Sequence, residues 1–172
     1  LNGSSNSSND ANAAGFPGVE GRIAIEPGDR IPLIPRQLLK LFVDIDVGPA
    51  LSFGAELNAV GGSLARGNEN GQHQPDGVYY LGPGRNPGYA VVNVQASYRV
   101  TPGLRLSGSI ANLFDRRYST AAQLGPTGFD AAGNFVARPF AADANGDQPL
   151  RHSTFYAPGA PRKFSVSLGA TF

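Results

Sequence analysis

The fold is decided by residues 37–60, whose sequence is QLLKLFVDIDVGPALSFGAELNAV. Apolar residues occupy every second position from residue 39 to residue 47, while Lys40, Asp44 and Asp46 fall on the opposite face. After a turn at 48–50, residues 51–60 repeat this alternation. A period of two over about ten residues is typical of β-strands. We therefore predict strands at 37–47 and 51–60, joined by a short turn.

Three further segments show the same alternation, at residues 89–100, 104–112 and 163–172. A short turn joins the first two of them, whereas long polar stretches occupy residues 1–36, 63–87 and 115–162. Connections that alternate between long and short are typical of outer-membrane β-barrels, which have tight periplasmic turns and long extracellular loops. The predicted fold class is all-β: an antiparallel, up-and-down transmembrane β-barrel segment of about five strands.

The composition excludes several classes of protein. The 172 residues include no cysteine, which rules out a disulfide scaffold, a thiol nucleophile and a cysteine metal site. The formal net charge of +1 gives no electrostatic footprint for nucleic acid, so we expect no nucleic-acid partner. A soluble all-β binding module with Gly/Pro-rich loops stays open as an alternative, and it would bury its apolar strand faces in a dry core.

Two late motifs and the C-terminus resemble the TonB-dependent outer-membrane receptor family. Residues 112–118, NLFDRRY, look like the motif that ends the penultimate barrel strand, and residues 155–162, FYAPGAPR, look like the segment before the last strand. The terminal aromatic residue, with apolar residues at alternate positions before it, resembles an outer-membrane assembly signal, here Phe164, Val166, Leu168 and Phe172. The structural motif residues are Asn112, Leu113, Phe114, Asp115, Arg116, Tyr118, Pro158, Gly159, Pro161 and Arg162.

The resemblance implies a barrel of about 22 strands around an N-terminal plug, which imports a scarce nutrient, a ferric siderophore foremost, with energy delivered through TonB. Because 172 residues hold only about five such strands, we expect the C-terminal portion of a longer receptor. Residues 1–36 would be an extracellular loop segment and residues 37–172 barrel strands.

The expected location is the outer membrane of a Gram-negative bacterium, with a periplasmic C-terminus. The partners that the resemblance implies are outer-membrane lipid, the barrel-assembly machinery and a small-molecule iron chelate. The plug and TonB would be reached through the N-terminal part of the receptor.

The candidate site residues are polar and aromatic side chains of the loops and of the lumen face. Loop aromatics and an arginine are the predicted ligand contacts, namely Tyr79, Tyr80, Arg138, Phe140 and Phe155. The charged residues predicted to share the lumen face, and to pair across strands, are Lys40, Asp44, Asp46, Glu56, Arg99 and Arg105. We interpret Asp115 and the arginines beside it as a structural corner fixed by Arg–Asp pairing.

No cofactor, metal ion or catalytic residue is predicted. His73 and His152 lie in different long loops and match no metal-binding motif. The Asp143–Asp147 cluster lacks the spacing of a calcium loop, so we interpret it as a turn. The sequence therefore indicates binding and transport, and we do not expect an enzyme.

Overall fold

The computed structural model of the chain describes residues 2–4, 22–136, 146 and 151–171. The chain divides into two compact units. The sheet unit comprises residues 35–61, 88–118 and 158–172, and the loop unit comprises residues 1–34, 62–87 and 119–157. None of the described residues belongs to a helix that is long and apolar enough to cross a membrane.

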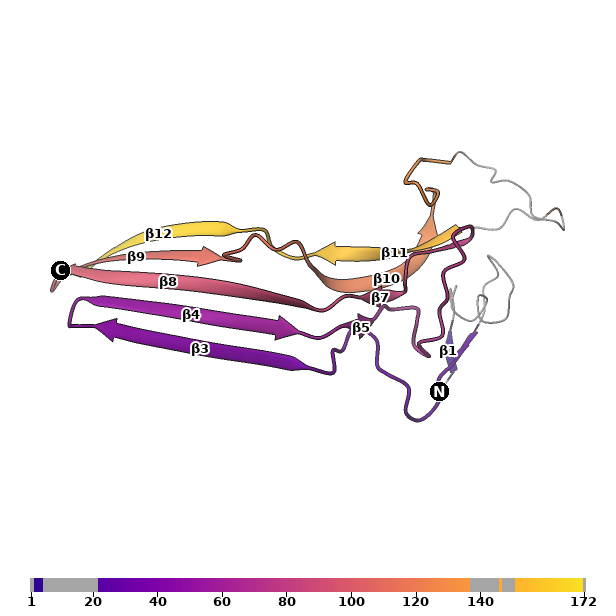
Figure 1. Cartoon of the computed structure of the whole chain (residues 1–172), viewed down its shortest axis with the longest axis horizontal. Coiled ribbons are helices and arrows are strands. Elements are labelled where there is room, and N and C mark those ends of the chain that lie inside the picture. Colours follow the sequence, from indigo (N-terminus) through magenta and orange to yellow (C-terminus); the bar gives the residue numbers. More distant parts are fainter. Residues whose placement is uncertain (1, 5–21, 137–145, 147–150, 172) are drawn as a thin grey trace. The chain divides into compact units, whose positions relative to one another are not determined.

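The sheet unit is one antiparallel β-sheet with the strand order β12-β9-β8-β4-β3 (Figure 1). Its strands are β3 (Leu38–Val47), β4 (Leu51–Val60), β8 (Tyr89–Thr101), β9 (Leu104–Ala111) and β12 (Lys163–Ala170). These are the five strands that the alternating pattern predicts, with ends that shift by at most two residues. Gly48 opens the β3–β4 turn with a φ of 67°, a value that favours glycine. The all-β, antiparallel fold class is confirmed.

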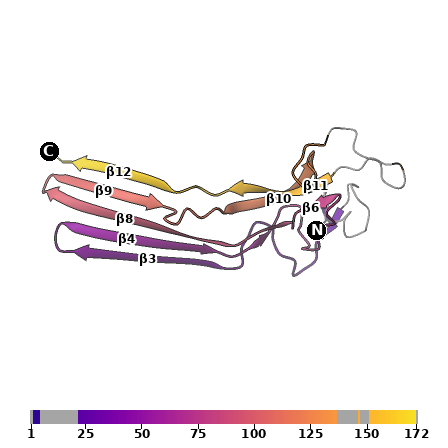
Figure 2. The same cartoon turned by 45° about the horizontal axis from the view of Figure 1, so that its top comes forward.

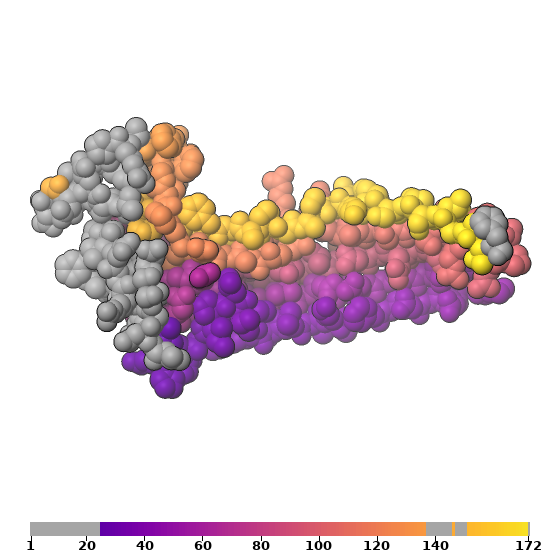
Figure 3. All heavy atoms as spheres, turned by 180° about the vertical axis from the view of Figure 1, so that it is seen from behind, coloured from indigo at the N-terminus to yellow at the C-terminus, as the bar shows by residue number. Residues whose placement is uncertain are grey.

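One face of this sheet is apolar from edge to edge. The strand register aligns Ile45, Phe53, Ala96, Gly108 and Val166 in a single row across all five strands. The row is uncovered, and Val166 is 79% exposed. Figure 3 shows a face on which the strand side chains are themselves the surface, with no other described part of the sheet unit over them. Among the described residues, no dry core forms between such faces, and this favours the wall of a barrel over the alternative of a soluble module.

The opposite face of the sheet is polar. The next row of the register joins Asp44, Gly54, Gln95, Ser109 and Ser165. One apolar face and one polar face are what the wall of a membrane barrel requires, because lipid lies outside it and water fills the lumen.

The loop unit contains the apolar core of the described chain. The antiparallel pairs are β1 (Asn2–Ser4) with β2 (Arg22–Ala24), and β5 (Ser63–Leu64) with β7 (Arg85–Asn86). A further sheet has the order β10-β11-β6, formed by Ser119–Thr127, Arg151–Pro158 and Tyr80–Leu81. Figures 1 and 2 both show β10 and β11 side by side. The buried apolar side chains of this unit are Leu64, Ala65, Tyr80, Leu81, Ala122 and Leu124.

The prediction that residues 63–87 and 115–162 are long loops is wrong in part, because they hold the strands β5, β6, β7, β10 and β11. The first three have only two residues each, too few for a period to be visible. The sequence of β10, STAAQLGPT, carries adjacent alanines and a proline, which strands disfavour. Packing within the loop unit therefore outweighs the local preference of these residues.

A charge placed on the apolar face should destabilise the folded protein far more than the same charge one residue away. We expect Val166→Arg to cost about 2–4 kcal/mol, because a cation near the middle of a lipid-facing strand loses its hydration. The matched control is Ser167→Arg on the polar face, where water remains, and its cost should be below about 1 kcal/mol. Urea unfolding of the full-length protein in lipid bilayers measures both. Equal losses would contradict the assignment of the two faces.

Candidate functional site

The family-like motif at residues 112–118 forms a tight corner at the end of β9. Asn112 is only 4% exposed and has a φ of 51°, a left-handed value that asparagine tolerates well. Its side-chain amide donates to the carbonyls of Arg116, at 2.9 Å, and Ala160, at 3.0 Å, and its Oδ1 accepts the Arg116 N–H at 2.9 Å. One side chain thus ties the corner to the segment that leads into β12.

A second set of hydrogen bonds stabilises the same corner. The Asp115 carboxylate accepts the main-chain N–H of Arg162 at 3.1 Å, and Leu113 donates its N–H to the Val92 carbonyl at 2.8 Å. The interpretation of Asp115 as part of a structural corner therefore fits these contacts. The hydrogen bond shown for Asp115 comes from the main chain of Arg162, and not from the guanidinium that we predicted as its partner.

Tyr118 and Gly159 connect the motif at residues 112–118 with the motif at residues 155–162. The Tyr118 ring packs against Tyr89 in a tilted arrangement with centroids 4.4 Å apart, and the Gly159 N–H donates to the Tyr118 carbonyl at 2.8 Å. A Cβ atom at position 159 would overlap the Tyr118 ring, so only glycine fits there. Beyond Gly159, the Arg162 guanidinium lies over the Phe164 ring, 5.7 Å from its centroid. Leu113 is half-buried, whereas the motif residues Phe114, Arg116, Pro158 and Pro161 are exposed.

A chain of hydrogen bonds runs across the polar face from β4 to the corner. Asn58 donates to Glu56 Oε1 at 2.7 Å, and Asn93 donates to Glu56 Oε2 at 3.2 Å. Asn93 Oδ1 in turn accepts the main-chain N–H of Asn112 at 2.9 Å. Glu56, which we predicted to pair with a cation, accepts hydrogen bonds from these two amides and also interacts electrostatically with Lys40. The lumen face and the family-like motif form one connected network.

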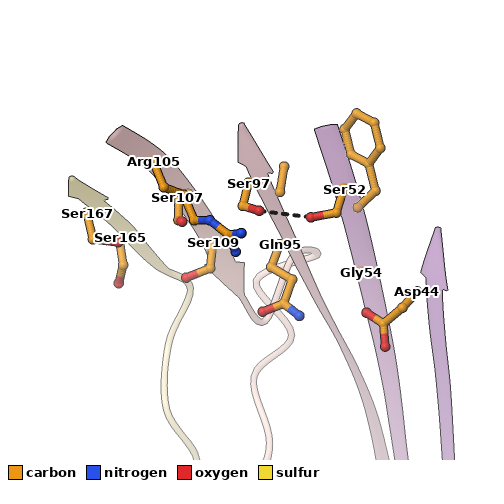
Figure 4. A pocket seen from close by; sticks show the side chains of 13 residues that line it. Asp44, Ser52, Gly54, Gln95, Ser97, Arg105, Ser107, Ser109, Ser165 and Ser167 are labelled. Carbon is orange, nitrogen blue, oxygen red and sulfur yellow. Dashed lines mark hydrogen bonds between the residues drawn. The ribbon is translucent and has the colours of Figure 1, made fainter. Parts of the chain in front are cut away.

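Beside this network the polar face holds an open depression of about 450 Å³. Asp44 and Arg105 line it together with Gln95 and several serine hydroxyls (Figure 4). Ser52 and Ser97 hydrogen-bond across it, with 2.8 Å between their Oγ atoms. Towards the β3–β4 turn, Asp46 shares a second depression with Arg99 and Arg105. These groups suit contact with water and polar surfaces.

The described residues include no cluster of three or more histidine, cysteine or carboxylate side chains that would hold a metal ion. Arg138, Phe140 and Phe172 lie outside the described residues. So does the Asp143–Asp147 cluster, except for Gly146.

In the loop unit, the predicted ligand contacts lie in different surroundings. Phe155 is 49% exposed and lines an open groove of about 320 Å³. Tyr79 is half-buried, and Tyr80 is interior, with 2% of its surface exposed. As folded, Tyr80 therefore has almost no surface to offer a ligand, and its structural surroundings are those of a core residue.

The groove also contains residues that the sequence reasoning missed, Leu33, Arg66 and Tyr156. The exposed Arg66 is held against β10 by main-chain hydrogen bonds, because its N–H donates to Ala122 at 2.9 Å and its carbonyl accepts from Leu124 at 2.8 Å. Leu33 has a φ of 64°, an uncommon value for a bulky residue. Backbone strain of this kind gathers at functional sites, and it was not visible in the sequence. The groove offers two aromatic rings and one cation.

Removing the Asn112 amide should destabilise the protein strongly. Asn112→Ala breaks the side-chain bonds to Arg116 and Ala160 and leaves main-chain groups without partners, so we expect a loss of about 2–4 kcal/mol. The matched control, Asn58→Ala, loses one bond on the same face and should cost about 1 kcal/mol. Urea unfolding of the full-length protein in lipid bilayers measures the difference. Equal effects would show that the corner is not a structural anchor.

Comparisons with known proteins find a matching family and structures of similar fold. A sequence model described as "TonB dependent receptor-like, beta-barrel" matches residues 3–113. No curated protein matches the chain. The closed form of Fiu, a ferric-catecholate import receptor of E. coli K12, is similar with 21% identity and a TM-score of 0.52, over 82% of this chain and 15% of that one. FyuA, the ferric yersiniabactin uptake receptor of Yersinia pestis, is similar with 20% identity and a TM-score of 0.53, over 84% of this chain and 17% of that one.

At such identities the two solved structures show likeness of fold alone. This chain spans 15% to 17% of their length. The family match, by contrast, covers more than half of the 172 residues. The resemblance noted in the sequence is therefore confirmed, and the location that the family implies is the outer membrane. The family is one of receptors and transporters, not of enzymes. The chain belongs to the TonB-dependent receptor family and represents part of its β-barrel.

Proposed function

We propose that the chain is the C-terminal part of a receptor that imports a ferric siderophore across the outer membrane. The observation that carries this proposal is the uncovered apolar face of the sheet, opposite a polar face, in a chain of this family. The two similar structures with TM-scores above 0.5 are both iron-chelate receptors, which supports the substrate class. The plug and TonB then act through parts of the receptor outside this chain.

The orientation in the membrane belongs to the same proposal. The β3–β4 turn, the β8–β9 turn and the end of β12 lie at one end of the sheet, because Val47 pairs with Leu51 and Ala170 pairs with Leu104. Short turns are periplasmic in bacterial barrels, so the C-terminus is periplasmic and the long connections between the strands are extracellular. In this orientation residues 1–36 remain an extracellular segment and residues 37–172 the barrel portion.

Lipid and the barrel-assembly machinery are the partners of the apolar face. In this proposal the alternating residues of β12, Phe164, Val166 and Leu168, together with Phe172, form the assembly signal. The same side chains then remain in contact with outer-membrane lipid after insertion.

The groove of the loop unit is the proposed contact for the iron chelate. Phe155 and Tyr156 supply aromatic surface, and Arg66 supplies a positive charge. These side chains suit an anionic ligand with aromatic rings. The guanidinium attracts the negative charge of such a ligand, and the aromatic faces stack on its rings. Tyr79, Arg138 and Phe140 remain predicted contacts. Tyr80 contributes by holding the loop unit together.

Loss of the groove cation and ring should weaken chelate binding without affecting folding. We expect Arg66→Ala and Phe155→Ala each to cost about 1–3 kcal/mol of binding free energy, or about 5-fold to 150-fold in Kd. The measurement is uptake of radioactive ferric siderophores by cells whose only such receptor is the full-length protein. Phe135→Ala, an exposed loop aromatic outside the groove, is the matched control. Unchanged uptake in both groove variants would refute the groove, and no uptake by the wild type of any ferric siderophore would refute the substrate class.

A further inference from the structure

Two buried histidines flank the most buried tyrosine of the loop unit. His73 is 7% exposed and His152 is 8% exposed. The Tyr80 ring meets His73 edge-on, with centroids 6.1 Å apart and an angle of 80° between the planes. Tyr80 also stacks on His152, with centroids 6.0 Å apart and an angle of 19° between the planes. The three rings join the segment of residues 68–86, which we name the latch segment, to strand β11.

Main-chain contacts hold the latch segment on β11. Strands β6 and β11 pair in parallel, with Tyr80 opposite His152. The His152 N–H donates to the Tyr79 carbonyl at 2.7 Å, and the Gly84 N–H donates to Thr154 Oγ1 at 2.9 Å. The latch segment is therefore attached to β11 at several points around the ring cluster.

His73 has one ring nitrogen satisfied and one not. Its Nε2 lies 3.1 Å from the Gly82 carbonyl, which can only accept, so Nε2 carries the hydrogen. Its Nδ1 is then an acceptor, and this atom is buried with no hydrogen-bond partner among the described residues. Gly84 packs against the ring so closely that a Cβ atom there would lie 2.8 Å from His73 Cδ2. The site fits a neutral imidazole.

Protonation would place an N–H group and a positive charge at the buried Nδ1. Burial lowers the pKa of His73 below its usual value, although the Gly82 carbonyl and the Asp76 carboxylate act in the opposite direction. The other titratable or charged groups on the elements around it are Tyr80 on β6, Arg85 on β7, and Arg151 and His152 on β11. His73 therefore binds a proton more readily when the latch segment is released from β11 than when it is held there. The attachment of the latch segment to β11 weakens as the pH falls through about 6.5.

We propose that His73 is an acid-sensitive latch: a proton from solvent binds at Nδ1 and releases the latch segment from β11. The geometry that carries this inference is the enclosed ring with a buried, unpaired Nδ1. This inference rests on the proposed function in one respect, which is the extracellular location of the latch segment. In that setting the latch makes the closure of an extracellular loop depend on external pH.

The test is hydrogen–deuterium exchange of the full-length receptor in lipid bilayers, followed from about pH 7.5 to about pH 5. Protection factors of peptides from residues 68–86, corrected for intrinsic exchange rates, report the opening. In the wild type, we expect the equilibrium constant for opening of the latch segment to rise several-fold between these pH values. The upper limit at pH 5 is about 30-fold, because the histidine of the open segment has an ordinary pKa of ~6.5. The conservative variant His73→Gln keeps a donor towards Gly82 but does not titrate, so its opening should stay constant. Strand β9 serves as the internal reference.

Each outcome decides the proposal. A wild-type protection factor that stays flat across the titration overturns it, whatever the variant does. A pH dependence that persists in His73→Gln overturns the assignment to His73. If the variant is open at all pH values, the wild-type curve alone decides, because it must rise below about pH 6.5 with the slope of one proton. No chelate is present, so the result is independent of the test of siderophore import.

Discussion

A sheet that crosses hydrocarbon has no water with which to pair its main-chain N–H and C=O groups. In the described sheet unit, β9, β8 and β4 have neighbours on both sides, whereas β3 and β12 stand at the two ends of the strand order. Each unpaired group at an open edge would cost several kcal/mol in lipid, so both edges need further strands. The chain spans 15% to 17% of the length of the two similar receptors.

The same requirement shapes the two faces and the corner between the strands. No other element of the described sheet unit packs over the apolar row through Ile45 and Val166. In the membrane, lipid covers this row. On the polar face, Glu56, Asn93 and Asn112 form a chain of hydrogen bonds that reaches the family-like motif. Asn112 then satisfies the carbonyls of Arg116 and Ala160, where regular strand pairing is interrupted. The motif is thus the means by which the backbone remains paired at a corner.

The sequence predicted the sheet unit well, because the side chains of a two-faced strand alternate with a period that sequence displays directly. The alternation at 37–47 and 163–172 located β3 and β12 to within two residues. The loop unit was less predictable. Strands β10 and β11 lack a clear period, and the burial of Tyr80 depends in part on His152, which is distant in sequence. Likewise Arg66 enters the groove only because its main chain pairs with β10.

One face of the sheet meets lipid and the other meets water, and spin labels along β12 can test this difference directly. The chain contains no cysteine, so single cysteines can be placed along β12 without a background signal. Spin labels at positions 163–169, in the full-length receptor in bilayers, can be tested for collision with dissolved oxygen and with a water-soluble nickel complex. We expect access to alternate with a period of two, with oxygen access highest at Phe164, Val166 and Leu168 and nickel access highest at Ser165 and Ser167. Uniform access along the strand, or alternation in the opposite phase, would contradict it.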